Sequence, residues 1–141
     1  MEINLRVYGI VIRNNHVLLS KEFIQNTWIV KFPGGGVHPE ESLSAALSRE
    51  FKEEMACTVK EVKHFYTTDA HVPSWFNSKQ RVLSVFYTLE LNELMPFDQL
   101  ILPEYCEHEL FWAPLQKPTL SAITLPIEHT VFKALLQLNR L

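Results

Sequence analysis

The chain has 141 residues, of which 47% are hydrophobic, and its formal net charge at pH 7 is -3. A chain of this length and composition can bury a core large enough to fold unaided, so we expect residues 1–141 to form a single domain. The slightly acidic balance argues against binding to a nucleic-acid polymer, which needs a basic face.

The N-terminal third predicts a hairpin followed by a short strand. Residues 5–13 and 16–21 are apolar and β-branched, and they flank the pair Asn14-Asn15, which favours a tight turn between strands. A further strand is expected at Thr27–Lys31, and it leads through Pro33 into three consecutive glycines. We expect these glycines to form a loop.

The middle and C-terminal parts predict two amphipathic helices and three strands. The first helix has one apolar stripe at helical spacing, made of Leu43, Ala46, Leu47, Phe51 and Met55. Strands are expected at residues 59–68, 81–91 and 108–113. A second helix at residues 127–138 carries Ile127, Val131, Leu135 and Leu138 on one face. This order predicts an α/β fold in which a mixed β-sheet lies between helices, an α/β/α sandwich.

Two proline-containing segments, residues 69–79 and 94–107, read as loops that shape a binding pocket. Trp75 and Phe76 in the first loop have two interpretations of equal weight: stacking on a base, or anchoring the loop on the core. Trp28 and Trp112 lie in strand-like runs, so we expect both to pack in the core.

The first helix also carries three acidic residues within one turn. Glu50 and Glu54 project into the same arc as the apolar stripe, and Glu53 lies beside them. Carboxylates of one sign repel each other and lose solvation near a core, and a bound cation offsets both costs. Because the ligands are oxygens only, they favour Mg²⁺, with Mn²⁺ or Ca²⁺ as alternatives, over zinc. Arg49, one turn before Glu53, can pair with it and fix its rotamer.

These residues share a register with a known family. The positions that match G-x5-E-x7-R-E-U-x-E-E-x-G-U, where U is apolar, are Gly35, Glu41, Arg49, Glu50, Phe51, Glu53, Glu54 and Cys57. The chain therefore resembles the Nudix hydrolases over these 23 residues. One position departs from the pattern: Ala56 stands where the family has glycine, at a helix end where alanine costs roughly 1 kcal/mol in a left-handed conformation.

The resemblance implies a Mg²⁺-dependent hydrolysis of a diphosphate linkage, in which a metal-activated water attacks phosphorus. It implies Glu50, Glu53 and Glu54 as metal ligands, with Arg49 orienting the acids and Glu41 holding Arg49. Gly34, Gly35 and Gly36 would let backbone amides approach the substrate. The candidates for the general base are Glu50 and three later acids, Glu104, Glu107 and Glu109.

The substrate stays open among small nucleotides: nucleoside triphosphates, nucleotide sugars, ADP-ribose and dinucleoside polyphosphates. Pro73 occupies the place where ADP-ribose hydrolases of the family carry a proline. An alternative is a nucleotide or nucleotide-sugar sensor without turnover, although sensors of this kind usually lose a motif acid. A third reading is an isomerase of isoprenoid diphosphates or a base-excising glycosylase, whose extra catalytic residues we do not find. Homodimers are common in the family.

The remaining polar residues predict no second site. The six histidines have no mutual spacing typical of zinc, and His38 reads as a solvated turn residue. With two cysteines, Cys57 and Cys106, reduced thiols and a cytoplasmic location are expected. No apolar run approaches the ~20 residues of a membrane helix, and the start of the chain lacks the basic and apolar segments of a signal peptide.

Overall fold

The structure is a computed structural model that describes residues 2–93 and 109–138. The chain separates into two compact units. One consists of Met1–Val11 and Pro33–Leu94, and the other of Ile12–Phe32 and Met95–Leu141. Each unit is described by itself.

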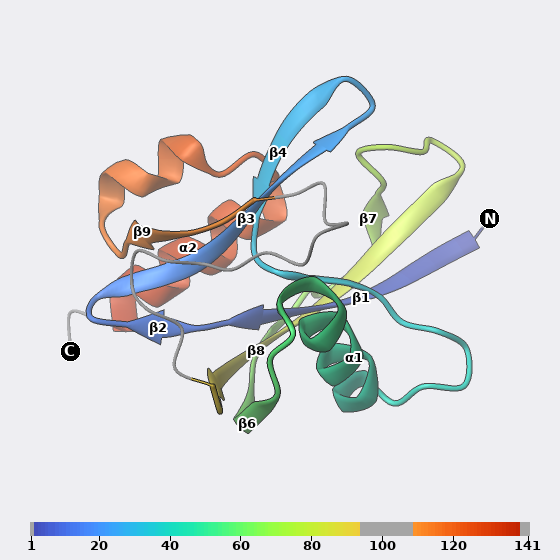
Figure 1. Ribbon diagram of the computed structural model, residues 1–141. Helices are drawn as coiled ribbons and strands as arrows, with labels where there is room; N and C mark the ends of the chain where they lie inside the picture. Colours follow the sequence, from blue (N-terminus) through green and yellow to red (C-terminus); the bar gives the residue numbers. More distant parts are fainter. Residues whose placement is uncertain (1, 94–108, 139–141) are drawn as a thin grey trace. The chain divides into compact units, whose positions relative to one another are not determined.

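The first unit is built on a mixed sheet, as the sequence predicts. Its strand order is β5 (Gly34–Gly36), β1 (Glu2–Ile10), β8 (Gln80–Leu91) and β6 (Val59–Thr67), with the short β7 (Val72–Pro73) also paired to β8. The long strands β1 and β8 run parallel, and the other pairs are antiparallel (Figure 1). The segment 34–36, expected as a loop, is therefore a short strand at the edge of the sheet.

Helix α1 (Leu43–Met55) covers one face of this sheet and contacts β1, β5 and β6. Four residues of its apolar stripe are buried as predicted, with Ala46, Leu47, Phe51 and Met55 at most 2% exposed, and Leu43 is half-buried. The approach to β1 is close, because a Cβ atom on Gly9 would lie 2.5 Å from Cε1 of Phe51. Glycine at position 9 therefore lets the helix sit against the strand.

The second unit contains an antiparallel sheet of β2 (Ile12–Arg13), β3 (His16–Ile24), β4 (Thr27–Lys31) and β9 (Glu109–Pro114). The predicted hairpin is confirmed: Asn14 and Asn15 have φ angles of 52° and 59°, the left-handed turn that this residue pair favours. A second hairpin of the same type, at Gln25 and Asn26 with φ angles of 49° and 62°, was not predicted.

The free edge of β4 is covered by side chains from the C-terminal part of the second unit. The 3₁₀-helix η1 (Lys117–Ala122) precedes α2 (Pro126–Leu138), which matches the helix predicted at 127–138. Thr124 Oγ1 accepts a hydrogen bond from the Val30 N–H at 2.9 Å, and the buried Glu128 accepts one from the Phe32 N–H at 2.9 Å. These contacts satisfy donors that an edge strand would otherwise leave unpaired.

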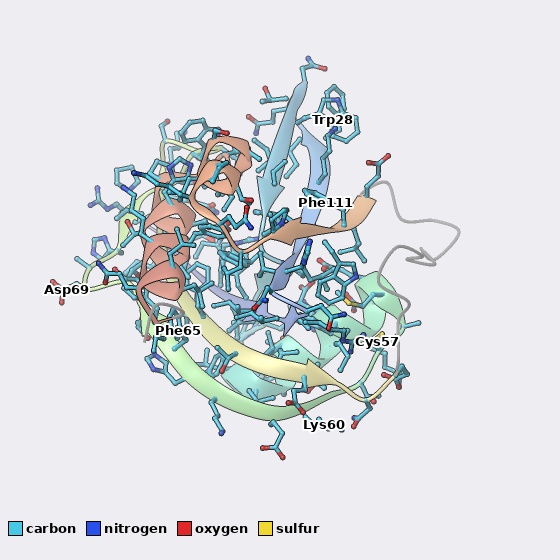
Figure 2. The ribbon with its side chains drawn as sticks, turned by 90° about the vertical axis from the view of Figure 1, so that its left-hand side faces the viewer. Trp28, Cys57, Lys60, Phe65, Asp69 and Phe111 are labelled. Carbon is cyan, nitrogen blue, oxygen red and sulfur yellow. The ribbon has the colours of Figure 1, made fainter. Side chains whose placement is uncertain are left out.

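Two expectations from the sequence are wrong in detail. The strand expected at 5–13 is two strands, because β1 ends at Ile10 and β2 begins at Ile12 in a different sheet. Trp28 is not a core residue: it is 50% exposed at the end of the β3–β4 hairpin, with its ring 5.2 Å from that of Phe23 (Figure 2). On the predicted apolar face of α2, Leu138 lies in the last turn and is 55% exposed, whereas Val131 and Leu135 are buried.

The other two aromatic predictions have mixed outcomes. Trp112, in β9, is half-buried, and the guanidinium of Arg13 lies 5.6 Å from its ring centroid. In the loop before β8, Trp75 is 58% exposed and Phe76 is half-buried. The exposure of Trp75 leaves both interpretations of this loop open.

Candidate active site

Helix α1 carries the candidate site, and both of its ends are capped by hydrogen bonds. Ser42 caps its first turn, since its Oγ accepts a hydrogen bond from the Ala45 N–H at 3.1 Å. At the other end Ala56 adopts a left-handed conformation, with φ 53° and ψ 34°, and its N–H reaches the Lys52 carbonyl at 3.0 Å. The helix end is therefore not shifted by the missing glycine, and alanine bears the strain of the left-handed backbone.

Arg49 organises the acidic side chains of the site. Its guanidinium makes five hydrogen bonds, two to Glu41 at 2.6 and 3.0 Å, and one each to Glu50 at 3.1 Å, Glu53 at 3.3 Å and the Gly36 carbonyl at 2.9 Å. A guanidinium has five N–H donors, so each donor of Arg49 has an acceptor here. The pairings with Glu41 and Glu53 that the sequence predicts are both present.

The Arg49 contact changes the acidity of Glu41. The hydrogen bond from Arg49, together with the His38 backbone N–H, lowers the pKa of Glu41 from 4.5 to about 2. The same pairing raises the pKa of Arg49. Both groups are therefore charged throughout the neutral range, and the ion pair links the segment before α1 to the middle of the helix.

The three predicted metal ligands have different environments. Glu54 is buried, at 7% exposure, whereas the side chain of Glu50 is 14% exposed and that of Glu53 is 59% exposed. Within residues 2–93 and 109–138, no group of three or more His, Cys, Asp or Glu side chains is arranged to hold a metal ion. In this arrangement Glu50 Oε1 and Glu53 Oε2 both accept a hydrogen bond from Nη1 of Arg49, at 3.1 and 3.3 Å.

The glycine strand β5 lies directly against the acids. A Cβ atom on Gly35 would lie 2.6 Å from Cδ of Glu50, so only glycine leaves room for this carboxylate. Gly34 is required for another reason, because its φ is 154° and a Cβ there would lie 2.7 Å from Cα of Tyr8. Two of the three predicted glycines therefore have a demonstrable steric role.

The donor set of this site fits a hard divalent cation. All three candidate ligands are carboxylates, and one of them is buried. Gly35 has no side chain, so it does not cover the Glu50 carboxylate that lies against it. Mg²⁺ prefers oxygen ligands of this kind and is commonly held by one or two carboxylates together with substrate phosphates.

The remaining candidates for the general base belong to the second unit or fall outside the described residues. Glu109 is an exposed residue of β9 in the second unit, and Glu104, Glu107 and Cys106 fall outside the described part of the chain. His38 is exposed, as expected, and its backbone N–H donates to Glu41 at 2.9 Å. Arg6, which the sequence pattern does not single out, lies opposite Gly36 in the β1–β5 ladder. Only the strand register reveals it, since no motif includes it.

Comparisons with known proteins point to one family. The family model of the NUDIX domain matches residues 4–134. A segment of 62 residues is 44% identical to the RNA pyrophosphohydrolase of Vibrio cholerae serotype O1. This alignment covers 43% of the chain and 35% of the relative, so the chain spans about a third of the length of the curated relative that it matches.

Solved structures resemble the whole chain. The E. coli ORF135 protein has a TM-score of 0.71 at 21% identity, covering 99% of this chain and 92% of that chain. The MutT NUDIX hydrolase from Burkholderia pseudomallei has a TM-score of 0.73 at 16% identity, covering 94% of this chain and 98% of that chain. These matches confirm the fold class predicted from the sequence. In the described part of the chain, no helix has the length and apolar character needed to cross a bilayer.

Proposed function

Because this chain belongs to the Nudix family, we propose that it is a pyrophosphohydrolase, an enzyme that splits a diphosphate linkage in a nucleotide. The observation that carries the proposal is the Arg49 network, which gathers Glu41, Glu50 and Glu53 beside the glycine strand. A nucleotide diphosphate placed there would meet the backbone of β5 and the carboxylates on one face of α1.

Each residue of the site has a distinct role in this proposal. Glu50, Glu53 and Glu54 would hold Mg²⁺, with Mn²⁺ as an alternative. When bound, the ion supplies charge neutralisation at the diphosphate and makes water more acidic. Arg49 orients the carboxylates of Glu50 and Glu53, and Glu41 anchors Arg49.

The backbone of β5 and one acidic group complete the proposed reaction. Gly34, Gly35 and Gly36 bring backbone amides near the phosphates without side chains in the way. Water then attacks phosphorus, the P–O–P bond breaks, and the proton of the water passes to a general base. Glu50 is a candidate for that base because its carboxylate lies against Gly35.

The substrate class is a nucleotide with a diphosphate linkage, and two kinds are supported by different observations. The slightly acidic chain supports a small nucleotide, such as a nucleoside triphosphate, ADP-ribose or a nucleotide sugar. The similarity to a protein named RNA pyrophosphohydrolase supports hydrolysis of a diphosphate linkage on RNA. A cytoplasmic location is also part of the proposal, because a chain with only two cysteines, Cys57 and Cys106, is typical of a reducing compartment.

A Mg²⁺-supplemented screen tests the proposal. The purified chain is incubated with nucleoside triphosphates, ADP-ribose, nucleotide sugars, dinucleoside polyphosphates and 5′-triphosphorylated RNA, and products are identified by mass. We expect cleavage of a diphosphate bond in one of these classes. A nucleotide sensor would bind a compound of the panel and release no product, and that outcome would refute the enzymatic proposal.

A further inference from the structure

The face of the first unit's sheet that carries α1 becomes exposed at one end. Alternate residues of β1 point to this face, and their exposure increases towards the start of the strand: Val7 is fully buried, Leu5 is half-buried and Ile3 is 51% exposed. Val7 lies opposite Gly35, beside which the Glu50 carboxylate is placed. The exposed end therefore lies beyond the candidate active site on the same face.

Arg81 lies at this exposed end. The strand register pairs it with Ile3 of β1 and with Pro73 of β7, so all three side chains point to the α1 side of the sheet. Figure 1 shows the hairpin of β7 and β8 at the end of the sheet where β1 begins. Arg81 is four residues along and two strands across from Gly35, roughly 16 Å at the ordinary spacings of a sheet. It shares the face of the acidic residues without contacting them.

The Arg81 guanidinium is held in place and keeps unused donors. Its Nε donates to Nδ1 of His71 at 2.8 Å, and its Nη2 donates to the His71 carbonyl at 3.1 Å. A guanidinium has five N–H donors and these bonds use two, so three have no acceptor among residues 2–93 and 109–138. The side chain is half-buried. An arginine oriented in this way suits the oxygens of a phosphate.

An exposed tryptophan lies in the same hairpin. Trp75, in the loop that joins β7 to β8, is 58% exposed. Hydrogen bonds close this loop: Ser74 Oγ accepts from the N–H groups of Phe76 and Asn77 at 3.1 and 3.2 Å, and the Ser74 N–H donates to the Gln80 carbonyl at 3.0 Å. The ring is therefore presented to solvent on an ordered loop, and such a ring is a surface on which a nucleobase stacks.

The charge of this hairpin is complementary to a phosphate chain. Between residues 69 and 81 the cationic Lys79 and Arg81 outnumber one acidic residue, Asp69. Glu2 pairs with Gln80, so it points to the opposite face of the sheet. The acidic balance of the whole chain does not oppose local binding, because a short stretch of strand needs only one or two cations.

We propose that Arg81 and Trp75 form a second subsite that binds RNA beyond the diphosphate that is cleaved, with a backbone phosphate on Arg81 and a base stacked on Trp75. The inference rests on the proposed function and selects RNA from its two kinds of substrate. In the small nucleotides the phosphates are joined directly to one another, so none reaches Arg81 while another lies beside Glu50. In RNA a nucleoside separates successive backbone phosphates, and the strand can span both places.

Fluorescence anisotropy with a short labelled RNA tests this inference in the presence of Mg²⁺. The probe is a pentaribonucleotide with a 3′ fluorescein and a 5′ methylene-bridged diphosphate, which resists hydrolysis. We expect R81Q and W75A each to bind it about tenfold more weakly than the unmodified chain. R81K keeps the charge and should fall between the two. Adenosine α,β-methylene diphosphate, which has no second nucleotide, should bind all variants within about twofold of the unmodified chain.

Two substitutions on β6 of the same sheet are matched controls. K60Q removes one positive charge from a residue opposite Glu90, and H64A removes an exposed ring opposite Tyr87. Both positions lie at least six residues along β8 from Arg81. These variants should bind the RNA probe within about twofold of the unmodified chain.

Salt dependence and kinetics separate a binding role from a structural one. Loss of a phosphate contact in R81Q should reduce the slope of log Kd against log salt by about 0.7, whereas W75A should leave the slope unchanged. On the RNA of the screen, both variants should raise KM and leave kcat nearly unchanged. Circular dichroism is the folding control. If R81Q does not fold, R81K and W75A decide the question.

Four results would overturn the inference: no binding of the RNA probe by the unmodified chain, unchanged affinity in R81Q or W75A, an equal loss in K60Q and H64A, or an equal loss for the mononucleotide analogue. The proposed function fails separately. A chain that binds the probe through Arg81 and Trp75 and cleaves no compound of the panel would keep the subsite and lose the enzymatic role. Hydrolysis of a small nucleotide by a chain that does not bind the probe would do the reverse.

Discussion

Glu41 Oε2 accepts a hydrogen bond from Arg49 Nε at 2.6 Å, although the two residues are eight positions apart. The contact joins the segment that follows the glycine strand to the middle of α1. It also holds the pKa of Glu41 at about 2, well below its ordinary value of 4.5. The stability of the fold therefore depends on the protonation state of Glu41.

Replacement of Glu41 by glutamine tests that coupling through pH. A carboxylate whose pKa is lower in the folded state stabilises the fold fully above its ordinary pKa, and this contribution is lost as the pH falls towards the folded value. The unmodified chain should be more stable than E41Q above pH 4.5, and the difference should shrink as the pH falls towards about 2. Urea unfolding at a series of pH values measures it. A difference that does not change with pH would contradict the assigned pKa.

The contact between Gly35 and Glu50 predicts unequal effects of two alanine substitutions in β5. A methyl group at Gly35 would lie 2.6 Å from Cδ of Glu50, whereas the nearest atoms at Gly36 are 3.8 Å away. We expect G35A to lose about tenfold or more in turnover, because it displaces the carboxylate, and G36A to lose less. Steady-state rates, with circular dichroism as the folding control, compare them. Equal rates in both variants would show that the carboxylate position does not matter.

The left-handed residue at the end of α1 predicts a stabilising substitution. Ala56 has φ 53°, a conformation that glycine adopts without strain, so A56G should stabilise the chain by about 1 kcal/mol. A45G, at an exposed position inside the same helix, is the control and should destabilise it by roughly 0.5–1 kcal/mol. Chemical denaturation gives both values. Loss of stability in A56G would mean that the helix end differs from the one described.

Periodicity in the sequence is enough to predict the helix that carries the site. The apolar stripe fixes which face of α1 is buried, and the same wheel places Glu54 towards the core, where it is 7% exposed. The contacts of Arg49 with Glu41 and Glu53 also follow from the motif and from helical spacing. These features depend on residues close in sequence, which is why a single sequence predicts them.

Features that depend on strand pairing could not be predicted. The run at residues 5–13 is mostly apolar, and nothing in it marks Ile10 as the end of one sheet's strand. Trp28 is exposed because of its place at the end of a hairpin, opposite Phe23, which composition does not reveal. The pairing of Arg6 with Gly36 across the β1–β5 ladder is likewise not marked in the sequence. Register between distant segments is a tertiary property.

The most direct test of the central claim is the Mg²⁺-dependent turnover of E53Q and E54Q on the substrate found in the screen. The control is E40Q, because Glu40 is an acidic residue in the exposed segment before α1. The account predicts a loss of about a hundredfold or more in both E53Q and E54Q, with the fold retained and E40Q nearly unchanged. Rates like those of the unmodified chain in both variants would contradict it.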